Sequence, residues 1–192
     1  MRGNLVHLKV AFSGYGIELR PVTPLDLPAL RRWRNCPSIR KQMHDKSYIT
    51  PEQQRRWFES ISTRPDQVHW VIWFNRVRTG YVNIRAHVRD ERAQRFGGGY
   101  YLADTAVRQP LLGLSTVMMY HDIIFGHADG REIKDTIMKT NFSARGLNRL
   151  MGYREYGETS DVICISLLRD DYFRARQRFL RYFTNTQCLP IS

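Results

Sequence analysis

Apolar residues along the chain recur with two different periods. Two segments have a helical spacing behind clear start signals, Thr23-Pro24-Leu25-Asp26 and the capping box Thr50-Pro51-Glu52-Gln53. Two more helices are predicted. One covers 114–125, where the apolar pattern is long, and the other covers 142–150. Strands are predicted over 17–22, 68–74, 79–88, 99–103, 133–138 and 162–168.

The order of these elements predicts the fold class. The order is one strand, two helices, three strands and then alternating helices and strands. It predicts an antiparallel front half followed by a β-α-β-α-β back half. We therefore expect an α+β sandwich, a mixed central sheet flanked by helices, with one switch from antiparallel to parallel pairing. A cleft should open where the strands diverge at that switch.

The length of 192 residues, with 42% apolar residues, suits one well-buried domain. We expect a leader over 1–16, a core over 17–168 and a C-terminal helical extension over 169–192. Neither a membrane span nor an export signal is visible, and the scattered cysteines Cys36, Cys164 and Cys188 suggest free thiols. These features predict a cytoplasmic protein without a metal site.

The net charge of +12 favours a phosphate-bearing partner, whether nucleic acid, anionic lipid or a small molecule. The basic residues are dispersed, and no Lys/Arg tract is longer than two. This dispersion argues against a basic tail.

The segment Asn141-Phe142-Ser143-Ala144-Arg145-Gly146-Leu147-Asn148-Arg149-Leu150-Met151-Gly152-Tyr153 resembles a pattern of the GNAT superfamily of acyltransferases. There, an Asn precedes a helix that a Leu-Gly-Phe sequence closes before the next strand. The resemblance covers about residues 17–168 and implies this fold, N-acetyltransferase activity and acetyl-CoA as cosubstrate. It places Asn141 against CoA and Gly152 in a left-handed helix cap. The simpler interpretation is that Asn141 only caps the helix.

A second segment, Gly113-Leu114-Ser115-Thr116, enters the apolar helix and resembles the loop with which the family holds the CoA pyrophosphate on backbone N–H groups. This copy is altered, because Ser115 replaces a glycine and Pro110 lacks an N–H. Gly99 to Asp104 resembles the central strand, where Leu102 and Ala103 would offer N–H groups to the cofactor and to the thioester carbonyl.

The resemblance leaves the proton transfers open. Many relatives carry an acid Tyr seven residues after the Asn, where this chain has Asn148, and a Glu that often opens the central strand is missing because Gly97 and Gly98 fill that region. Asparagine cannot act as an acid. Asp104 or His87, acting through water, is the predicted base, with Tyr101 and Tyr153 as further titratable candidates.

The N-terminal helices resemble those of the branch that holds amino-sugar and ribosomal-protein N-acetyltransferases. The resemblance puts Trp33, Arg40 and Met43 near the acceptor, although Trp33 and Met43 would also suit a core and Arg40 a solvated surface. We expect a small-molecule amine, a nucleotide-linked amino sugar in particular, and neither membrane nor nucleic acid as partner. A homodimer is compatible with this interpretation. A protein Nα-acetyltransferase and a degenerate GNAT-fold binding module stay open as alternatives.

Overall fold

The computed structural model describes residues 4–87, 94–103 and 111–191. The strands are β1 (Ala11–Gly14), β2 (Ile17–Pro21), β3 (Gln67–Phe74), β4 (Val77–Ala86), β5 (Arg95–Leu102), β6 (Glu132–Met138), β7 (Arg154–Glu158), β8 (Val162–Leu168) and β9 (Leu189–Ile191). The α-helices are α1 (Leu27–Asn35), α2 (Pro37–Arg40), α3 (Pro51–Ser62), α4 (Leu112–Asp122), α5 (Phe142–Leu150) and α6 (Arg169–Leu180).

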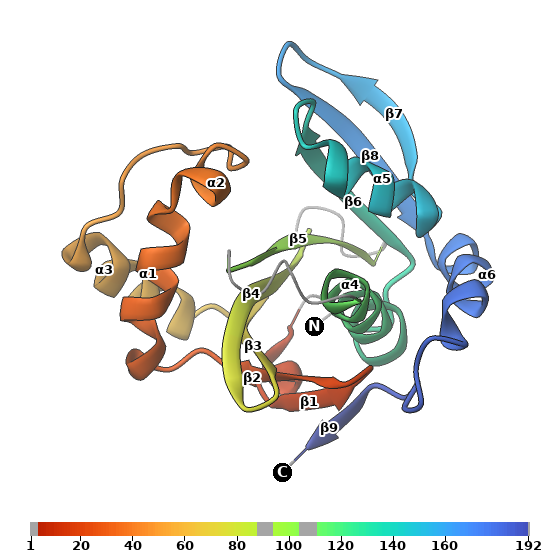
Figure 1. The fold of residues 1–192 in the computed structure, drawn as a ribbon, viewed down its shortest axis with the longest axis horizontal. Helices are drawn as coiled ribbons and strands as arrows, with labels where there is room; N and C mark the ends of the chain where they lie inside the picture. The colour runs from red at the N-terminus through yellow and green to blue at the C-terminus, as the bar shows by residue number, and fades with distance from the viewer. Residues whose placement is uncertain (1–3, 88–93, 104–110, 192) are drawn as a thin grey trace.

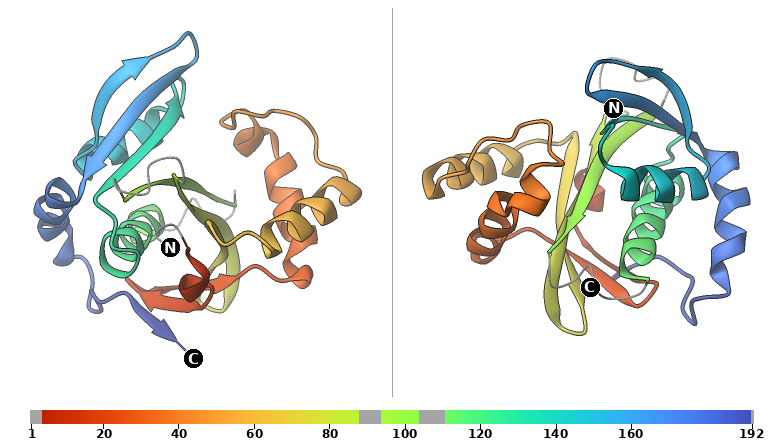
Figure 2. Two further views of the ribbon diagram at one scale, coloured as in Figure 1. Left: turned by 180° about the vertical axis from the view of Figure 1, so that it is seen from behind. Right: turned by 45° about the horizontal axis from the view of Figure 1, so that its top comes forward.

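The described strands form one mixed sheet in the order β7-β8-β6-β5-β4-β3-β2-β1-β9. Of these neighbours, only β5 and β6 pair in parallel, and all the others pair antiparallel. Helices α1–α3 lie on one side of the sheet and α4–α6 on the other (Figures 1 and 2). The predicted α+β sandwich with a single switch to parallel pairing is therefore confirmed.

Helix α4 is the centre of the core. All of its residues from Ser115 to Asp122 are buried, as expected of a helix enclosed on all sides. The carboxylate of Asp122 accepts hydrogen bonds from Tyr172 (2.6 Å) and from Arg176 (3.0 Å), both on α6. These bonds fasten the C-terminal helix to α4.

Local signals account for several element ends. The capping box at the start of α3 is present, with Thr50 N–H donating to Gln53 Oε1 (2.8 Å) and Gln53 N–H donating to Thr50 Oγ1 (3.2 Å). At the end of α5, Gly152 has a φ of +96°, and the N–H of Tyr153 donates to the carbonyl of Asn148 (3.0 Å). This is the left-handed cap that the sequence predicted.

Three strands differ from the expectation. The segment taken as a leader contributes β1, and the C-terminal extension is helical only to Leu180 before β9 pairs with β1. Strand β7 has an exposed side chain at every position and therefore lacks the apolar alternation that marks a strand. Among the described helices, none is long and apolar enough to span a membrane.

Candidate active site

The parallel strands β5 and β6 separate almost as soon as they meet. They pair only at Arg95 with Glu132 and at Phe96 with Ile133, and beyond these two positions a gap opens between them. The carboxylate of Asp135 lies at the narrow end of this gap. Its Oδ2 accepts the N–H of Gly98 on β5 (2.7 Å), and its Oδ1 accepts the N–H of Thr136 (2.8 Å).

The glycines at the start of β5 leave room for this arrangement. A Cβ on Gly97 would lie 2.8 Å from the carbonyl oxygen of Lys134 and 2.9 Å from Nε2 of His87, and one on Gly98 would overlap the carbonyl of Asn83. Gly98 also has a φ of +145°, which side chains rarely allow. Gly97 and Gly98 are therefore required where the sheet opens.

The backbone of β5 presents donors to the gap. The N–H of Ala103 donates to Thr79 on β4 (2.8 Å). Because neighbouring residues of an antiparallel strand point their N–H groups to opposite edges, the N–H groups of Tyr100 and Leu102 face the gap. Of the two residues predicted on this strand, Leu102 directs its N–H toward the gap, whereas that of Ala103 is used within the sheet.

The N-terminus of α4 offers further donors. Leu111 has a φ of +69°, and the first intrahelical bond runs from Ser115 N–H to its carbonyl (2.7 Å), so the N–H groups of the first helical residues, including Gly113 and Leu114, have no partner within the helix. A Cβ on Gly113 would meet no atom within 4 Å. Such an open, positively polarised end suits the pyrophosphate of CoA.

Other predicted cofactor residues make bonds within the protein. The hydroxyl of Ser115 donates to the Tyr15 carbonyl (2.9 Å) and that of Thr116 to the Leu112 carbonyl (2.8 Å). Asn141 caps α5, because its Oδ1 accepts the N–H of Ala144 (3.2 Å). Asp104, which was predicted as a base, and Pro110 of the altered loop lie outside the described residues.

A pocket of about 440 Å³ adjoins the gap at the start of β5. It is lined by Arg85, His87, Arg95, Lys134, Asp135, Thr136 and Tyr156. Behind it, Glu132 binds Arg95 (2.7 Å) and lies 3.7 Å from Lys134, whose ammonium group lies 5.1 Å from the centre of the Tyr156 ring. Three cations and one carboxylate thus line a single hollow.

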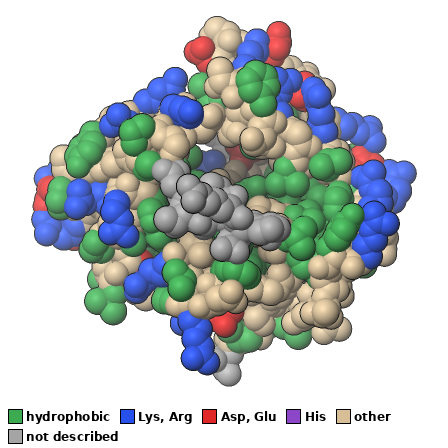
Figure 3. Space-filling view, viewed as in Figure 1, with side chains coloured by type: hydrophobic (Ala, Val, Ile, Leu, Met, Phe, Trp, Pro, Cys, Tyr) green, Lys and Arg blue, Asp and Glu red, His purple; other side chains and the backbone are tan. Residues whose placement is uncertain are grey.

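The N-terminal helical group reaches the same region. In Figure 3 the molecular surface is hollowed between helices α1–α3 and strands β6–β8. His44, which follows α2, hydrogen-bonds the hydroxyl of Thr136 through its Nε2 (3.2 Å). Asn35 holds the returning chain, because its side chain both donates to and accepts from the backbone of Ile49 (2.8 Å each).

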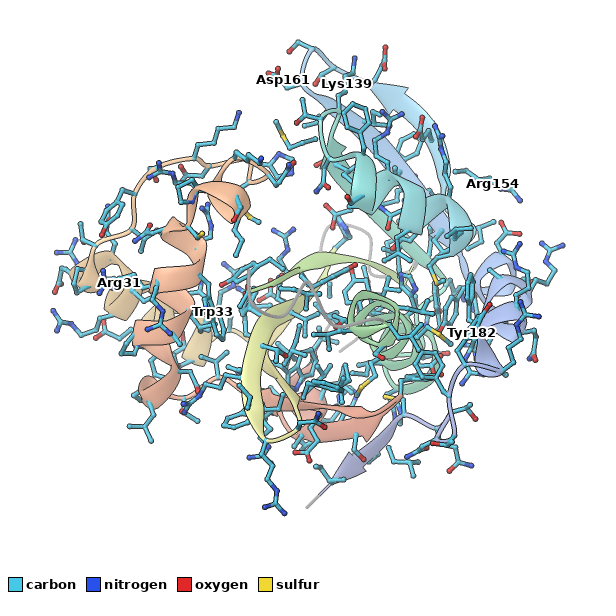
Figure 4. All side chains as sticks on the ribbon, in the orientation of Figure 1. Arg31, Trp33, Lys139, Arg154, Asp161 and Tyr182 are labelled. Atoms are coloured by element: carbon cyan, nitrogen blue, oxygen red, sulfur yellow. The ribbon has the colours of Figure 1, made fainter. Side chains whose placement is uncertain are left out.

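The predicted acceptor residues have different surroundings. Trp33 points from α1 toward the sheet and packs against the core, whereas Arg31 points away (Figure 4). Arg40 and Met43 are half-buried at the end of α2 and just after it. None of Trp33, Arg40 and Met43 is among the described residues that line the pocket.

Arg34 is a half-buried cation on α1. Its Nη2 donates to the carbonyl of Asp45, and its Nη1 is buried with no partner among the described residues. Burial lowers the pKa of this guanidinium, and electrostatic interactions with Tyr101 on β5 and with Asp45 oppose that shift. A buried donor without a partner is energetically costly.

Buried hydroxyl groups lie on the α4 side of the gap. The Tyr153 hydroxyl and His121 Nε2 form a hydrogen bond (2.9 Å), and burial lowers the pKa of His121 to about 3. Burial raises the pKa of Tyr120 and Tyr153 well above the usual value, and the charge of Asp135 raises both further. These tyrosines therefore stay protonated, and their hydroxyl groups can donate or accept a hydrogen bond.

The side chain that sequence reasoning missed is Asp135. Nothing in the pattern of β6 distinguishes it, and only the register of β6 beside β5 brings it to Gly98. His87, a predicted base, lies beside it, with Nε2 3.2 Å from the Lys134 carbonyl. Asn148 is half-buried on α5, where its carbonyl serves the helix cap. Among the described residues, no group of His, Cys, Asp and Glu side chains could hold a metal ion.

Comparison with solved structures finds the same fold. A spermidine N-acetyltransferase from Vibrio cholerae, in complex with CoA and spermine, has a TM-score of 0.73 at 15% identity and covers 82% of this chain and 98% of its own. A nucleotide-linked sugar GNAT in its apo form has a TM-score of 0.77 at 15% identity, covering 89% and 97%. An aminoglycoside acetyltransferase in complex with coenzyme A has a TM-score of 0.70 at 17% identity, covering 83% and 99%.

Comparison with curated proteins finds no match. The model of the acetyltransferase (GNAT) domain family, however, matches residues 17–154, which is most of the chain and includes both sides of the gap. The resemblance noted in the segment from Asn141 to Tyr153 is thereby confirmed at the level of the superfamily. The chain belongs to the GNAT acetyltransferase family, and it is an acetyl-CoA-dependent N-acetyltransferase.

Proposed function

We propose that the protein acetylates a primary amine on a phosphate-bearing small molecule, a nucleotide-linked amino sugar in particular. The observation that carries this proposal is the pocket beside the gap, in which Arg85, Arg95 and Lys134 surround one carboxylate. Guanidinium and ammonium groups bind phosphate oxygens through charge-assisted hydrogen bonds. An acceptor held there by its phosphate would present its amine to the gap.

The charge of the surrounding helices supports the same substrate class. Residues 27–64 contain nine Lys and Arg against three Asp and Glu, so the segment that forms α1–α3 is strongly basic. A basic approach surface raises the local concentration of an anionic substrate. It would repel polyamines and the basic peptide termini that an Nα-acetyltransferase of ribosomal proteins would take.

On the other side of the gap, the chain offers backbone N–H groups to CoA. Leu102, Gly113 and Leu114 would hold it through hydrogen bonds that need no particular side chain. This arrangement tolerates the altered loop, in which Ser115 stands where relatives carry glycine. Acetyl-CoA supplies the acetyl group, and the residues of the chain bind, orient and exchange protons.

Two finer expectations stay predictions. The thiols of Cys36, Cys164 and Cys188 form no disulfide, which suits a reducing compartment and hence the cytoplasm. A homodimer stays compatible with this interpretation, and sedimentation at several protein concentrations would test it.

The proposal is tested by release of free CoA thiol from acetyl-CoA with a panel of acceptors: nucleoside-diphosphate amino sugars, spermidine, an aminoglycoside and terminal peptides. We expect turnover with the nucleotide-linked sugars. Arg85→Ala and Lys134→Ala should each raise the KM for that acceptor about 10- to 150-fold, the effect of a lost hydrogen bond to a charged group, while the KM for acetyl-CoA changes less than about twofold.

Lys139→Ala is the matched control. Lys139 is also on the β6 side, just beyond the strand, but lies near Asp161 at the tip of the β7–β8 arm (Figure 4) and pairs with Glu158 (3.1 Å). Turnover with peptides or polyamines alone would contradict the proposed acceptor. CoA binding without turnover of any amine would instead indicate a binding module.

A further inference from the structure

We infer that Asp135 is the catalytic residue that binds the acceptor's ammonium group and removes its proton. This inference rests on the proposed function, because it assigns a role within the same site. Neither the altered CoA loop nor the start of the central strand provides such a carboxylate among the described residues. Strand β6 provides it instead.

The position of Asp135 is the first argument. Its carboxylate lies at the narrow end of the gap, two residues beyond Ile133, the last residue of β6 that pairs with β5, and it accepts the N–H of Gly98 across that gap. It also lines the basic pocket on one side, and its charge acts on the buried hydroxyls of Tyr120 and Tyr153 on the other. Asp135 therefore lies between the acceptor pocket and the cofactor side.

The glycines of β5 are the second argument. A side chain on Gly97 would come within 3.3 Å of Oδ2 of Asp135 as well as against His87. The chain thus leaves positions 97 and 98 of β5 without side chains, and a carboxylate from the neighbouring strand occupies the space. His87 Nε2 lies beside that space and can carry a proton onward.

The bonding capacity of the carboxylate is the third argument. Two carboxylate oxygens offer about four acceptor sites, and the backbone N–H groups of Gly98 and Thr136 use two of them. These two bonds fix the orientation of the carboxylate, and its remaining acceptor sites can receive an ammonium group. The three cations of the pocket would hold the acceptor's phosphate, and the Asp135 carboxylate would hold its ammonium group in the same pocket.

The reaction then balances as follows. The acceptor enters as an ammonium ion, and one proton passes to the Asp135 carboxylate. The lone pair of the free amine forms the carbon–nitrogen bond with the acetyl carbon, while the carbon–sulfur bond breaks and its electron pair leaves with sulfur. A second proton from nitrogen neutralises the thiolate, and Asp135 releases its proton to water.

The test uses Asp135→Asn, which keeps the size of the side chain and an acceptor oxygen for the backbone. We expect kcat to fall about 10²- to 10⁴-fold, as for the loss of a positioned base, with the KM for acetyl-CoA and the CoA-induced rise in melting temperature unchanged. Asp135→Ala should be equally slow, and formate should restore part of its turnover. Asp161→Asn, at the far tip of the β7–β8 arm, is the control and should keep full activity.

The outcomes separate this inference from the proposed function. If the wild type turns over no amine, the proposed function fails. If the wild type is active and Asp135→Asn retains kcat within about threefold, the role of Asp135 is wrong while the function stands. A slow Asp135→Ala that formate does not rescue, together with a fast Asp135→Asn, would show that Asp135 only holds β5.

Discussion

Residues 27–64, which form α1–α3, carry nine Lys and Arg against three Asp and Glu, whereas residues 112–168, from α4 to β8, carry six against seven. The two segments lie on opposite sides of the gap between β5 and β6 (Figure 1). On the α4 side, the groups available to a ligand are backbone N–H groups at a helix end and a strand edge. On the opposite side, they are basic side chains, both those of α1–α3 and those of the pocket residues Arg85, Arg95 and Lys134.

This difference separates the tasks of the two sides. Backbone donors at a helix N-terminus hold a phosphate through geometry that many sequences can build. Basic side chains can instead be replaced one at a time, so the acceptor class depends on individual residues such as Arg85. We therefore expect cofactor binding to tolerate substitution and acceptor choice to respond to it.

The largest expected effect is at the point where the two sides meet. Gly98→Ala should lower the free energy of unfolding by about 3 kcal/mol, because a side chain is strained at its positive φ and would overlap the Asn83 carbonyl. For a chain of this size, that corresponds to a fall of about 6–12 °C in melting temperature.

Gly99→Ala is the matched control for Gly98→Ala. A Cβ at Gly99 meets no atom within 4 Å, so this change should alter the melting temperature by less than about 2 °C. If both variants melt like the wild type, the start of β5 does not need its glycines and the geometry given for the gap is wrong.

These glycines illustrate which features of the structure can be predicted from the sequence and which cannot. Local signals predicted the capping box of α3, and the family resemblance predicted the left-handed cap at Gly152. Each depends on residues within one helical turn. The place of Asp135 depends on the register of β6 beside β5, which joins residues 37 positions apart. Strand β9 likewise exists through pairing with β1 at the other end of the chain.

The predicted site residues divide in the same way. Gly113 and Leu114 lie where the helix start suggested, since a helix N-terminus is a local feature. Trp33 was proposed for the acceptor from a resemblance, and it packs against the core, which only the tertiary fold decides. Arg34 lies on the same helix, and one nitrogen of its guanidinium is buried without a hydrogen-bond partner in the part of the chain that the structure describes.

Each side of the gap also contains a buried histidine. Together they predict that the free energy of unfolding falls at acidic pH. Burial lowers the pKa of His121 on α4 to about 3 and of His69 on β3, beneath α3, to about 4. An unfolded histidine takes up a proton below about pH 6.5, so each site loses stability as the pH falls from there toward its folded pKa. At pH 5 the loss is about 2 kcal/mol for each.

The measurement is the free energy of unfolding between pH 4 and pH 6 for the wild type, His69→Gln and His121→Gln. Each variant should reduce the slope by about one proton, or about 1.4 kcal/mol per pH unit, whatever its stability at neutral pH. A slope unchanged in both variants would mean that neither histidine stays neutral in the folded protein.

The smallest expected effect is at Asn148, on the cofactor side. Its position in the sequence suggested a place near the leaving thiolate, and it is the carbonyl of Asn148 that accepts the Tyr153 N–H in the helix cap. An alanine keeps that carbonyl and favours the helix slightly. Asn148→Ala should therefore change the free energy of unfolding by less than about 0.7 kcal/mol and single-turnover rates by less than about threefold. Asn148→Tyr, which would place a hydroxyl on the same helix face, should raise the rate only if Tyr120 and Tyr153 do not already supply a proton. A thousandfold loss in Asn148→Ala with CoA binding intact would show that its amide takes part in the chemistry, and would move the reacting atoms away from Asp135 toward α5.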